Sequence, residues 1–338
     1  MFRNIGDYHF LADPESGMTF RWGKTLDEDP IFSPVPELAD ISISNRCSKG
    51  CSFCYKDSTP EGKQMSIDDY RQVLDSLQSP EYGSVFQIAI GGGEPLEHPD
   101  FLQIVEETVR RGIVLNFTTN GQLITNDVCS ALKGKVGAMA ISASSIHELK
   151  RIKPAIDCAK GLKVNIHYIL NRTSIEEATT IVNGAYNDLL KGINALVFLT
   201  YKPAGRGSDT HLLQFDAKTQ AFVNAIKSPQ TSFKIGFDAC FIPMLLRGKA
   251  VRNEMVDTCE GGFFSVYIDE NMRVSPCSFS GGRDSYSLEE FDFYDIWLNK
   301  LQPYRDRVKN DCQRDCHARE MCRGCCPYYP QITSCYQI

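Results

Sequence analysis

The stretch RCSKGCSFCY, residues 46–55, places three cysteines close together directly after a strand-like run. Three residues separate Cys47 from Cys51, and two separate Cys51 from Cys54. Each iron of a four-iron cubane needs one ligand from outside the cube, so three thiolates leave one iron open. An open iron can chelate a small molecule, whereas a site that only stores electrons normally has four cysteines. The spacing therefore predicts an iron-sulfur cluster with one iron free for a ligand.

The competing interpretation of these cysteines is a zinc site, because zinc also binds paired thiolates. Zinc would need a fourth ligand, and the nearest histidine, His9, precedes the strand. The C-x3-C-x2-C spacing, with the aromatic Phe53 before the third cysteine, resembles the signature of the radical S-adenosylmethionine (SAM) superfamily. The resemblance implies that the open iron binds the amino and carboxylate groups of SAM and that Phe53 lies near the adenine.

A second motif, GGGEP at residues 91–95, follows a predicted strand at 84–90. Parallel sheets place their ligand-binding loops at this end of the strands. Glycines let the backbone pass close to a ligand, and a carboxylate can pair with an ammonium group. Alone, the run would predict only a tight turn. It resembles the GGEP motif of the same superfamily, which implies contacts to SAM from Gly92, Gly93, Glu94 and Pro95.

Polar residues also lie along, end or follow the later predicted strands. The resemblance implies contacts to the ribose, sulfonium or carboxylate of SAM for Thr119, Asn120, Ser142, Asn165, His167 and Arg206. For each of them alone, a helix cap, a turn or a core hydrogen bond is an equal interpretation. Many relatives have Asp-Gly after the serine at position 142, and this chain lacks it. By placement only, Asp238, Tyr201 and His167 are candidates for a catalytic acid or base.

Strand-like runs alternate with amphipathic helical segments from residue 39 onward. The runs are 39–44, 84–90, 113–118, 136–142, 162–170 and 195–200. Six alternating units predict an α/β protein with a parallel sheet, and the resemblance implies a partial (βα)6 TIM-like barrel. We expect a hairpin extension at residues 1–38, the barrel at 39–230, and a small cysteine-rich domain at 231–338 that begins with a hairpin near 263–274.

The cysteines of that last region resemble the SPASM extension of radical SAM enzymes, which usually holds two auxiliary [4Fe-4S] clusters. The resemblance implies one ligand set for each cluster: Cys312, Cys316, Cys322 and Cys335 for the distal one, and Cys259, Cys277 and Cys326 for the nearer one. The nearer set lacks its usual fourth cysteine. Either Cys240 completes this set or one iron stays open for substrate.

Three features of this region depart from the usual pattern. Three residues instead of two separate Cys312 from Cys316, Met272 stands where a hairpin glycine is common, and Cys325 replaces a glycine. A zinc-ribbon domain is the competing interpretation of such paired cysteines. The first cysteine motif favours iron-sulfur clusters over zinc here too.

Composition excludes several classes of protein. The chain has 338 residues and a net charge of -6, with no basic stripe for a nucleic-acid backbone. Its apolar runs are strand-sized, far below the roughly 20 residues that a bilayer requires, and the amino terminus lacks a secretion signal. We therefore expect a cytoplasmic protein, whose 14 cysteines favour metal ligation over disulfides. Cys129 and Cys158 are expected to be ordinary core residues.

The resemblance implies an enzyme that cleaves SAM reductively to a 5'-deoxyadenosyl radical, which abstracts hydrogen from a substrate. A ribosomally made peptide is the first expectation, with a crosslink, a thioether or an oxidised side chain as the product. Oxidation or rearrangement of a small molecule such as a sugar or amine is the second. A non-catalytic iron-sulfur electron carrier is the third. A flavodoxin or ferredoxin is the expected low-potential electron donor.

Overall fold

The computed structural model describes residues 1–252, 256–310 and 326–332. Six parallel strands form the centre of the fold, at the positions that the sequence predicts. They are β4 (Leu38–Ser44), β7 (Gln87–Gly92), β8 (Val114–Thr119), β9 (Ala138–Ala143), β10 (Val164–Leu170) and β11 (Ala195–Thr200). Each strand pairs in parallel with the next, so their carboxyl ends lie at one edge of the sheet.

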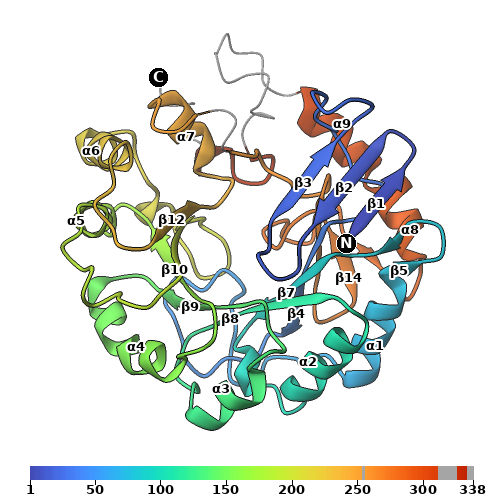
Figure 1. The fold of residues 1–338 in the computed structure, drawn as a ribbon, viewed down its shortest axis with the longest axis horizontal. Coiled ribbons are helices and arrows are strands. Elements are labelled where there is room, and N and C mark those ends of the chain that lie inside the picture. Colours follow the sequence, from blue (N-terminus) through green and yellow to red (C-terminus); the bar gives the residue numbers. More distant parts are fainter. Residues whose placement is uncertain (253–255, 311–325, 333–338) are drawn as a thin grey trace.

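Helices follow these strands and cover the outside of the curved sheet (Figure 1). They are α1 (Ile67–Ser76), α2 (Phe101–Arg110), α3 (Asn126–Leu132), α4 (Ile146–Cys158), α5 (Ile175–Val182) and α6 (Ala217–Ile226). Apolar strand residues such as Ile41, Ile88 and Leu115 are fully buried in the main core. Because side chains alternate along a strand, polar residues such as Asp40 and Asn116 face the inside. The fold is the expected partial barrel.

The sheet extends beyond the six strands on both sides. β12 (Lys234–Phe237) pairs in parallel with β11, so one more strand follows residue 230 in the same sheet. On the other side, β13 (Ser265–Ile268) pairs in parallel with β4 and antiparallel with β14 (Arg273–Ser275). β14 in turn pairs with β15 (Tyr286–Ser287). The predicted hairpin is confirmed, and its pairing with the first barrel strand produces one ten-stranded sheet.

Met272, at the turn of this hairpin, has a φ angle of 55°. This is the left-handed region, which glycine adopts most easily, and it explains why a glycine is common here. A side chain in this conformation costs about 1 to 2 kcal/mol. The Met272 side chain is buried in the main core. Its burial offsets a cost of that size.

Residues near the amino terminus form a three-stranded antiparallel sheet: β1 (Phe2–Ile5), β2 (Tyr8–Ala12) and β3 (Thr19–Trp22). The predicted hairpin is therefore confirmed, with β1 as an additional strand. Phe10 and Tyr8 point inward and pack in a second core with Phe86, Phe264 and Tyr304. This core attaches the small sheet to the barrel and to the carboxyl-terminal region.

The remaining described elements are short. They are β5 (Gln78–Ser79), β6 (Gly83–Ser84), η1 (Pro95–Glu97), η2 (Asp209–His211), α7 (Ile242–Arg247), α8 (Phe293–Asp295), η4 (Ile296–Lys300), α9 (Gln302–Asn310) and η5 (Pro330–Ile332). Within the described residues, the helices are all too short or too polar to cross a bilayer.

Candidate active site

The first cysteine loop, residues 47–54, directly follows β4 at the carboxyl edge of the sheet. The thiols of Cys47, Cys51 and Cys54 are free, and all three residues are half-buried. Burial raises the pKa of Cys47 and of Cys51, and nearby acidic groups raise it further. Thiols ligate metals in their deprotonated form, so metal binding at this loop would release protons.

Arg206, in the loop after β11, holds the first cysteine loop in place. Its Nε donates a hydrogen bond to the carbonyl oxygen of Cys51 at 2.9 Å, and its backbone N–H donates to that of Cys54 at 3.0 Å. Its Nη1 donates to Asp57 Oδ1 at 3.1 Å and to the carbonyl oxygen of Ser58 at 3.0 Å. The guanidinium is thus committed to the cysteine loop, and its contact with SAM stays a prediction.

The glycine run at the end of β7 packs against the same loop. The Gly93 N–H donates to the carbonyl oxygen of Ser44 at 2.6 Å, and the Glu94 N–H donates to that of Arg46 at 2.8 Å. A Cβ atom on Gly92 would overlap the Ser44 carbonyl, and one on Gly93 would overlap the Arg46 carbonyl. Gly92 also has a φ of 112°, which excludes other residues. The glycines therefore allow this close approach of two loops.

Glu94 connects the ends of β7 and β8. Its Oε1 accepts hydrogen bonds from Thr119 Oγ1 at 2.7 Å and from the Leu96 N–H at 3.1 Å, and its Oε2 accepts from the Asn120 N–H at 2.7 Å. Pro95 begins η1 directly after it. Burial raises the pKa of Glu94, while the bonds from Asn120 and Thr119 lower it. The carboxylate is held rigidly and can still accept a further donor, since each oxygen has two lone pairs.

Asn120 carries an unusual feature. Its Oδ1 accepts from the Gln122 N–H at 2.9 Å, but its buried side-chain Nδ2 has no hydrogen-bond partner. Buried donors are nearly always paired, so an orphan of this kind points to a ligand that completes it. The backbone N–H of the same residue binds the Glu94 carboxylate, so the two residues together offer a donor and an acceptor to an amino acid. These groups, with three thiols beside them, fit SAM bound to an iron-sulfur cluster.

The donor set of the first cysteine loop also fits a cubane rather than a single ion. Among the described residues, no three histidine, cysteine or carboxylate side chains lie close enough to hold one metal ion. A cubane needs wider spacing, because each thiolate bonds a different iron. Phe53 is half-buried in this loop, and its contact with adenine stays a prediction.

Three further predicted residues lie on the barrel strands. Ser142 and His167 are register partners on β9 and β10, near the carboxyl edge. The His167 Nδ1 lies 3.5 Å from Thr118 Oγ1, and burial lowers the pKa of His167 to about 4. Asn165 lies nearer the amino end of β10, and its Oδ1 accepts a hydrogen bond from Asn194 at 2.8 Å. Of these three residues, Ser142 and His167 lie nearer than Asn165 to the edge of the sheet that carries the first cysteine loop.

The three candidates for a catalytic acid or base differ in how far their polar atoms are already engaged in hydrogen bonds within the protein. The Tyr201 hydroxyl donates to the Ser208 carbonyl oxygen at 3.0 Å and accepts from the Ser208 N–H at 2.7 Å, so it is committed to its own loop. Asp238 accepts from Thr200 Oγ1 at 2.7 Å and from Lys202 Nζ at 3.0 Å. His167 is neutral at physiological pH, because its pKa is low.

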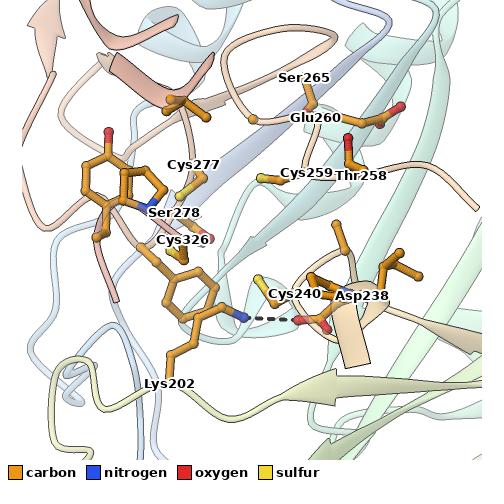
Figure 2. A pocket seen from close by; sticks show the side chains of 18 of the residues that line it. Lys202, Asp238, Cys240, Thr258, Cys259, Glu260, Ser265, Cys277, Ser278 and Cys326 are labelled. Atoms are coloured by element: carbon orange, nitrogen blue, oxygen red, sulfur yellow. Dashed lines mark hydrogen bonds and ion pairs between the residues drawn. The ribbon is translucent and has the colours of Figure 1, made fainter. Parts of the chain in front are cut away.

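A second group of cysteines lines a cavity of about 290 Å³ at the carboxyl-terminal region (Figure 2). Its members are Cys240, after β12, and Cys259, Cys277 and Cys326. Among the described residues, none of these four cysteines forms a disulfide bond. Burial, together with the nearby Cys259, raises the pKa of Cys277 to about 12. The other predicted ligands, Cys312, Cys316, Cys322 and Cys335, lie outside the described residues, as does Cys325.

Contacts between the first cysteine loop and this region complete the site. Lys56 Nζ donates to Glu270 Oε2 at 2.8 Å and to the Tyr267 hydroxyl at 2.9 Å. The rings of Tyr55 and Phe279 lie 4.8 Å apart. No local pattern in the sequence marks these contacts. Glu270 and Tyr267 lie 214 and 211 positions after Lys56. Sequence patterns therefore could not find them.

Two other residues escaped the sequence patterns. Lys49, between Cys47 and Cys51, forms an ion pair of 3.0 Å with Glu148 on α4. Glu148 Oε2 also accepts from the Ser144 N–H and hydroxyl, both at 2.7 Å. The ion pair ties the cysteine loop to the region that follows β9. Lys49 is the one basic residue inside the C-x3-C spacing, which is a weak signal for such a role.

A wider cavity of about 890 Å³ adjoins the cysteine-lined one. The two share Ala239, Ile242, Thr258 and Glu260. Charged residues of β3 and of the segment before β13 line the wider cavity, including Arg21 and Asp257. Cys129 and Cys158 are remote from both cavities: their sulfurs lie 3.9 Å apart, with Cys129 buried and Cys158 half-buried against the main core.

Comparisons with known proteins agree with this geometry. Residues 41–173 match the family model described as Radical SAM superfamily. The mycofactocin maturase MftC of Mycobacterium tuberculosis is 31% identical over 88% of this chain and 83% of its own length. The AdoMet-dependent heme synthase of Methanosarcina barkeri is 23% identical over 86% of this chain and 91% of its own length. The crystal structure of Streptococcus suis SuiB bound to its precursor peptide SuiA superposes with a TM-score of 0.66, at 17% identity, over 87% of this chain and 72% of that one.

Proposed function

The chain belongs to the radical SAM superfamily, and from this we propose that it is an enzyme that modifies a ribosomally made peptide. The observation that carries the proposal is the contact between the first cysteine loop and the glycine run, which brings three free thiols beside Glu94 and Asn120. Family membership implies SAM and one [4Fe-4S] cluster. We propose Cys47, Cys51 and Cys54 as the ligands of that cluster.

When bound, the cluster would supply the electron that cleaves SAM and so generates the radical that removes hydrogen from the substrate. The residues of this chain would hold these groups. Glu94 would accept a hydrogen bond from the ammonium group of SAM, and the unpartnered amide of Asn120 would donate to its carboxylate. Arg206 and Lys49 fix the cysteine loop so that the cluster cannot shift. Fixed geometry matters because a free radical reacts with whatever lies nearest.

We further propose that residues 231–338 hold two auxiliary [4Fe-4S] clusters. Cys259, Cys277 and Cys326 share one cavity, which supports them as a ligand set. Cys312, Cys316, Cys322 and Cys335 form the second proposed set. The organisation into an extension (1–38), a barrel (39–230) and this domain is part of the proposal, with β12 as the strand that continues the barrel sheet past the boundary.

A peptide is the proposed substrate because of the proteins that this chain resembles. MftC is named a maturase, and SuiB was solved with a precursor peptide. The cavity of about 890 Å³ beside the cysteines offers room for a peptide segment. A small-molecule substrate is the second candidate, which the similarity to a heme synthase favours. An electron carrier without SAM chemistry has less support, since it would need neither Glu94 nor an incomplete cysteine set.

Anaerobic assays separate these candidates. The protein is reconstituted with iron and sulfide, reduced with dithionite or with a flavodoxin or ferredoxin, and mixed with SAM. We expect 5'-deoxyadenosine, and a mass change in a short peptide encoded beside the gene. Deoxyadenosine formation without any change in such a peptide would favour a small molecule. If fully loaded protein does not cleave SAM, the enzymatic proposal is wrong.

A further inference from the structure

Lys202 is a buried cation beside the second group of cysteines. It lies just after β11, and its side chain is only 5% exposed. Its Nζ donates to Asp238 Oδ2 at 3.0 Å and to the Thr200 carbonyl oxygen at 3.1 Å, and it lies 4.4 Å from the centre of the Phe279 ring. Lysine is almost never fully buried without a partner, because an unpaired ammonium is costly to remove from water.

Cys240 and Lys202 line the same cavity. An ammonium group has three N–H donors, and Asp238 and the Thr200 carbonyl accept from two of them. The third N–H is left for a ligand thiolate at Cys240. Figure 2 shows Lys202 and Asp238 joined at one side of the cavity, with Cys240 between them and the other cysteines.

Cys240 lies close enough to the three cysteines proposed for the nearer cluster to share a cavity with them and to interact with the charges of two of them. It lines the same cavity as Cys259, Cys277 and Cys326. Burial raises its pKa, the ammonium of Lys202 lowers it, and Asp238, Cys259 and Cys326 raise it again. The three sequence-predicted ligands leave one iron without a thiolate. Among the described residues, Cys240 is the one further cysteine at this cavity.

We propose that Lys202, anchored by Asp238, holds Cys240 in place as the fourth ligand of the nearer auxiliary cluster and raises the reduction potential of that cluster. The inference rests on the proposed function, which supplies the cluster. A cluster becomes more negative when it is reduced, and net charge and hydrogen bonds to its sulfurs set its potential. An ammonium beside a ligand sulfur therefore favours the reduced form. Asp238 offsets part of this charge, but removing Lys202 alone would leave the Asp238 carboxylate uncompensated, so loss of the ammonium lowers the potential.

A closed fourth position changes what the nearer cluster can do. Substrate could not bind directly to its iron, so the cluster would exchange electrons without holding the substrate. Lys202 is a positioning residue in this arrangement, because it acts through Cys240. Its position just after β11 also places it between the barrel interior and the cavity.

The test uses protein in which Cys47, Cys51 and Cys54 are all replaced by alanine, so that only auxiliary clusters bind and SAM cleavage plays no part. Reduction is followed by electron paramagnetic resonance as the potential is lowered. We expect Lys202→Met to shift one of two transitions to lower potential with unchanged iron content. Lys202→Arg keeps the positive charge, so its reduction potential should stay close to that of the wild type. Lys218→Met, at a half-exposed surface ion pair, should change nothing.

Cys240→Ser provides the second readout. Serine keeps the size of the side chain but replaces the ligand sulfur, so we expect the spectrum of the same cluster to change. An unchanged spectrum in this variant, or unchanged potentials in folded Lys202→Met protein, would overturn the inference. If Lys202→Met does not fold, as judged by circular dichroism, the serine variant decides alone. Should the triple-alanine background bind no iron, the proposed auxiliary clusters are wrong and the inference fails with them, whereas SAM cleavage by the wild-type protein tests the proposed function separately.

Discussion

The ring of Tyr55 lies 4.8 Å from the ring of Phe279, centre to centre. Tyr55 directly follows the last cysteine of the first loop, and Phe279 lies two residues after Cys277. The Lys202 ammonium lies over the same Phe279 ring, with its Nζ 4.4 Å from the ring centre. One aromatic contact therefore joins the two proposed cluster sites. It gives a direct mechanical link between the barrel and the cysteine-lined cavity.

Replacing Phe279 by alanine should loosen this link. We expect the free energy of unfolding to fall by about 1 to 3 kcal/mol, because a half-buried aromatic side chain and its ring contacts are lost. Urea unfolding under anaerobic conditions measures the change. Phe20→Ala is the control, since Phe20 is 51% exposed and should have little effect. Equal stability of the two variants would contradict the role of the contact.

Cys51→Ala should remove the first cluster and SAM cleavage together. Losing one of three thiolates leaves too few ligands, so we expect iron to fall from about twelve to about eight per chain, as one of three four-iron clusters is lost. Iron and sulfide counts, with a deoxyadenosine assay, measure both effects. Cys129→Ala serves as the control, because Cys129 is buried in the core away from both cavities. Full iron content in the Cys51 variant would refute the proposed ligand set.

Arg206→Lys should weaken the first cluster without removing a ligand. Lysine cannot make the separate Nε and Nη1 bonds that hold Cys51, Asp57 and Ser58. We expect faster loss of about four irons when a chelator is added, while the auxiliary clusters stay loaded. The rate of bleaching at visible wavelengths follows the loss. A wild-type rate in this variant would show that the clamp is dispensable.

Asn120→Ala should affect SAM more than the fold. The orphaned amide of Asn120 gains no partner within the protein, so its removal costs little stability beyond the bond from Gln122. Losing one hydrogen bond to the ligand, about 1.4 kcal/mol, weakens SAM binding about tenfold. Equilibrium dialysis of SAM against cluster-loaded, unreduced protein, which does not cleave SAM, measures the affinity. The prediction fails if stability drops sharply while SAM affinity is unchanged.

His167 should make stability depend on pH in acid. Burial lowers the pKa of folded His167 to about 4, below its unfolded value of about 6.5. Between these values the unfolded chain binds a proton that the folded chain does not, so stability falls as the pH is lowered from about 6.5 to about 4. The full effect is at most about 3 kcal/mol.

The variant His167→Asn isolates this contribution. Its unfolding free energy should lose less than that of the wild type over the same pH range, because asparagine does not titrate. Thr118 and Asp238 remain present in both proteins, so their effects cancel in the difference. Apoprotein is used in both series, which keeps metal release out of the comparison. Parallel pH profiles for the two proteins would rule out the assigned pKa.

The barrel could be predicted from the sequence because its strands are local patterns. Each of the six begins within about three residues of the predicted start, since runs of apolar residues bounded by turns mark buried strands. β1 was missed because FRNI is only four residues long and has two polar residues between Phe2 and Ile5, so it shows no alternating pattern. β12 was assigned to the cysteine-rich region because the alternation of strand and helix patterns ends near residue 228. Its parallel pairing with β11 is a tertiary contact, which a local sequence pattern does not show.

The site was predicted only where a motif is contiguous. The first cysteine loop and Gly92 to Glu94 are short runs, and the structure brings them together at the edge of the sheet. The resemblance implied a contact between Asn165 and SAM, but Asn165 lies near the amino end of β10, where its Oδ1 accepts a hydrogen bond from Asn194. Lys202 could not be predicted, because its role depends on Cys240 and Asp238, which no spacing rule connects to it.

The pairing of β13 with β4 has a consequence for synthesis on the ribosome. Leu38 pairs with Ser265, across most of the length of the chain. At roughly 5 to 20 residues per second, the partner of that strand emerges on the order of ten to fifty seconds later. During this interval one edge of the first barrel strand stays unpaired, and unpaired strand edges attract other chains. We therefore expect this edge of the nascent protein to need shielding, by a chaperone or by its own amino-terminal sheet, until residues 265–268 have emerged.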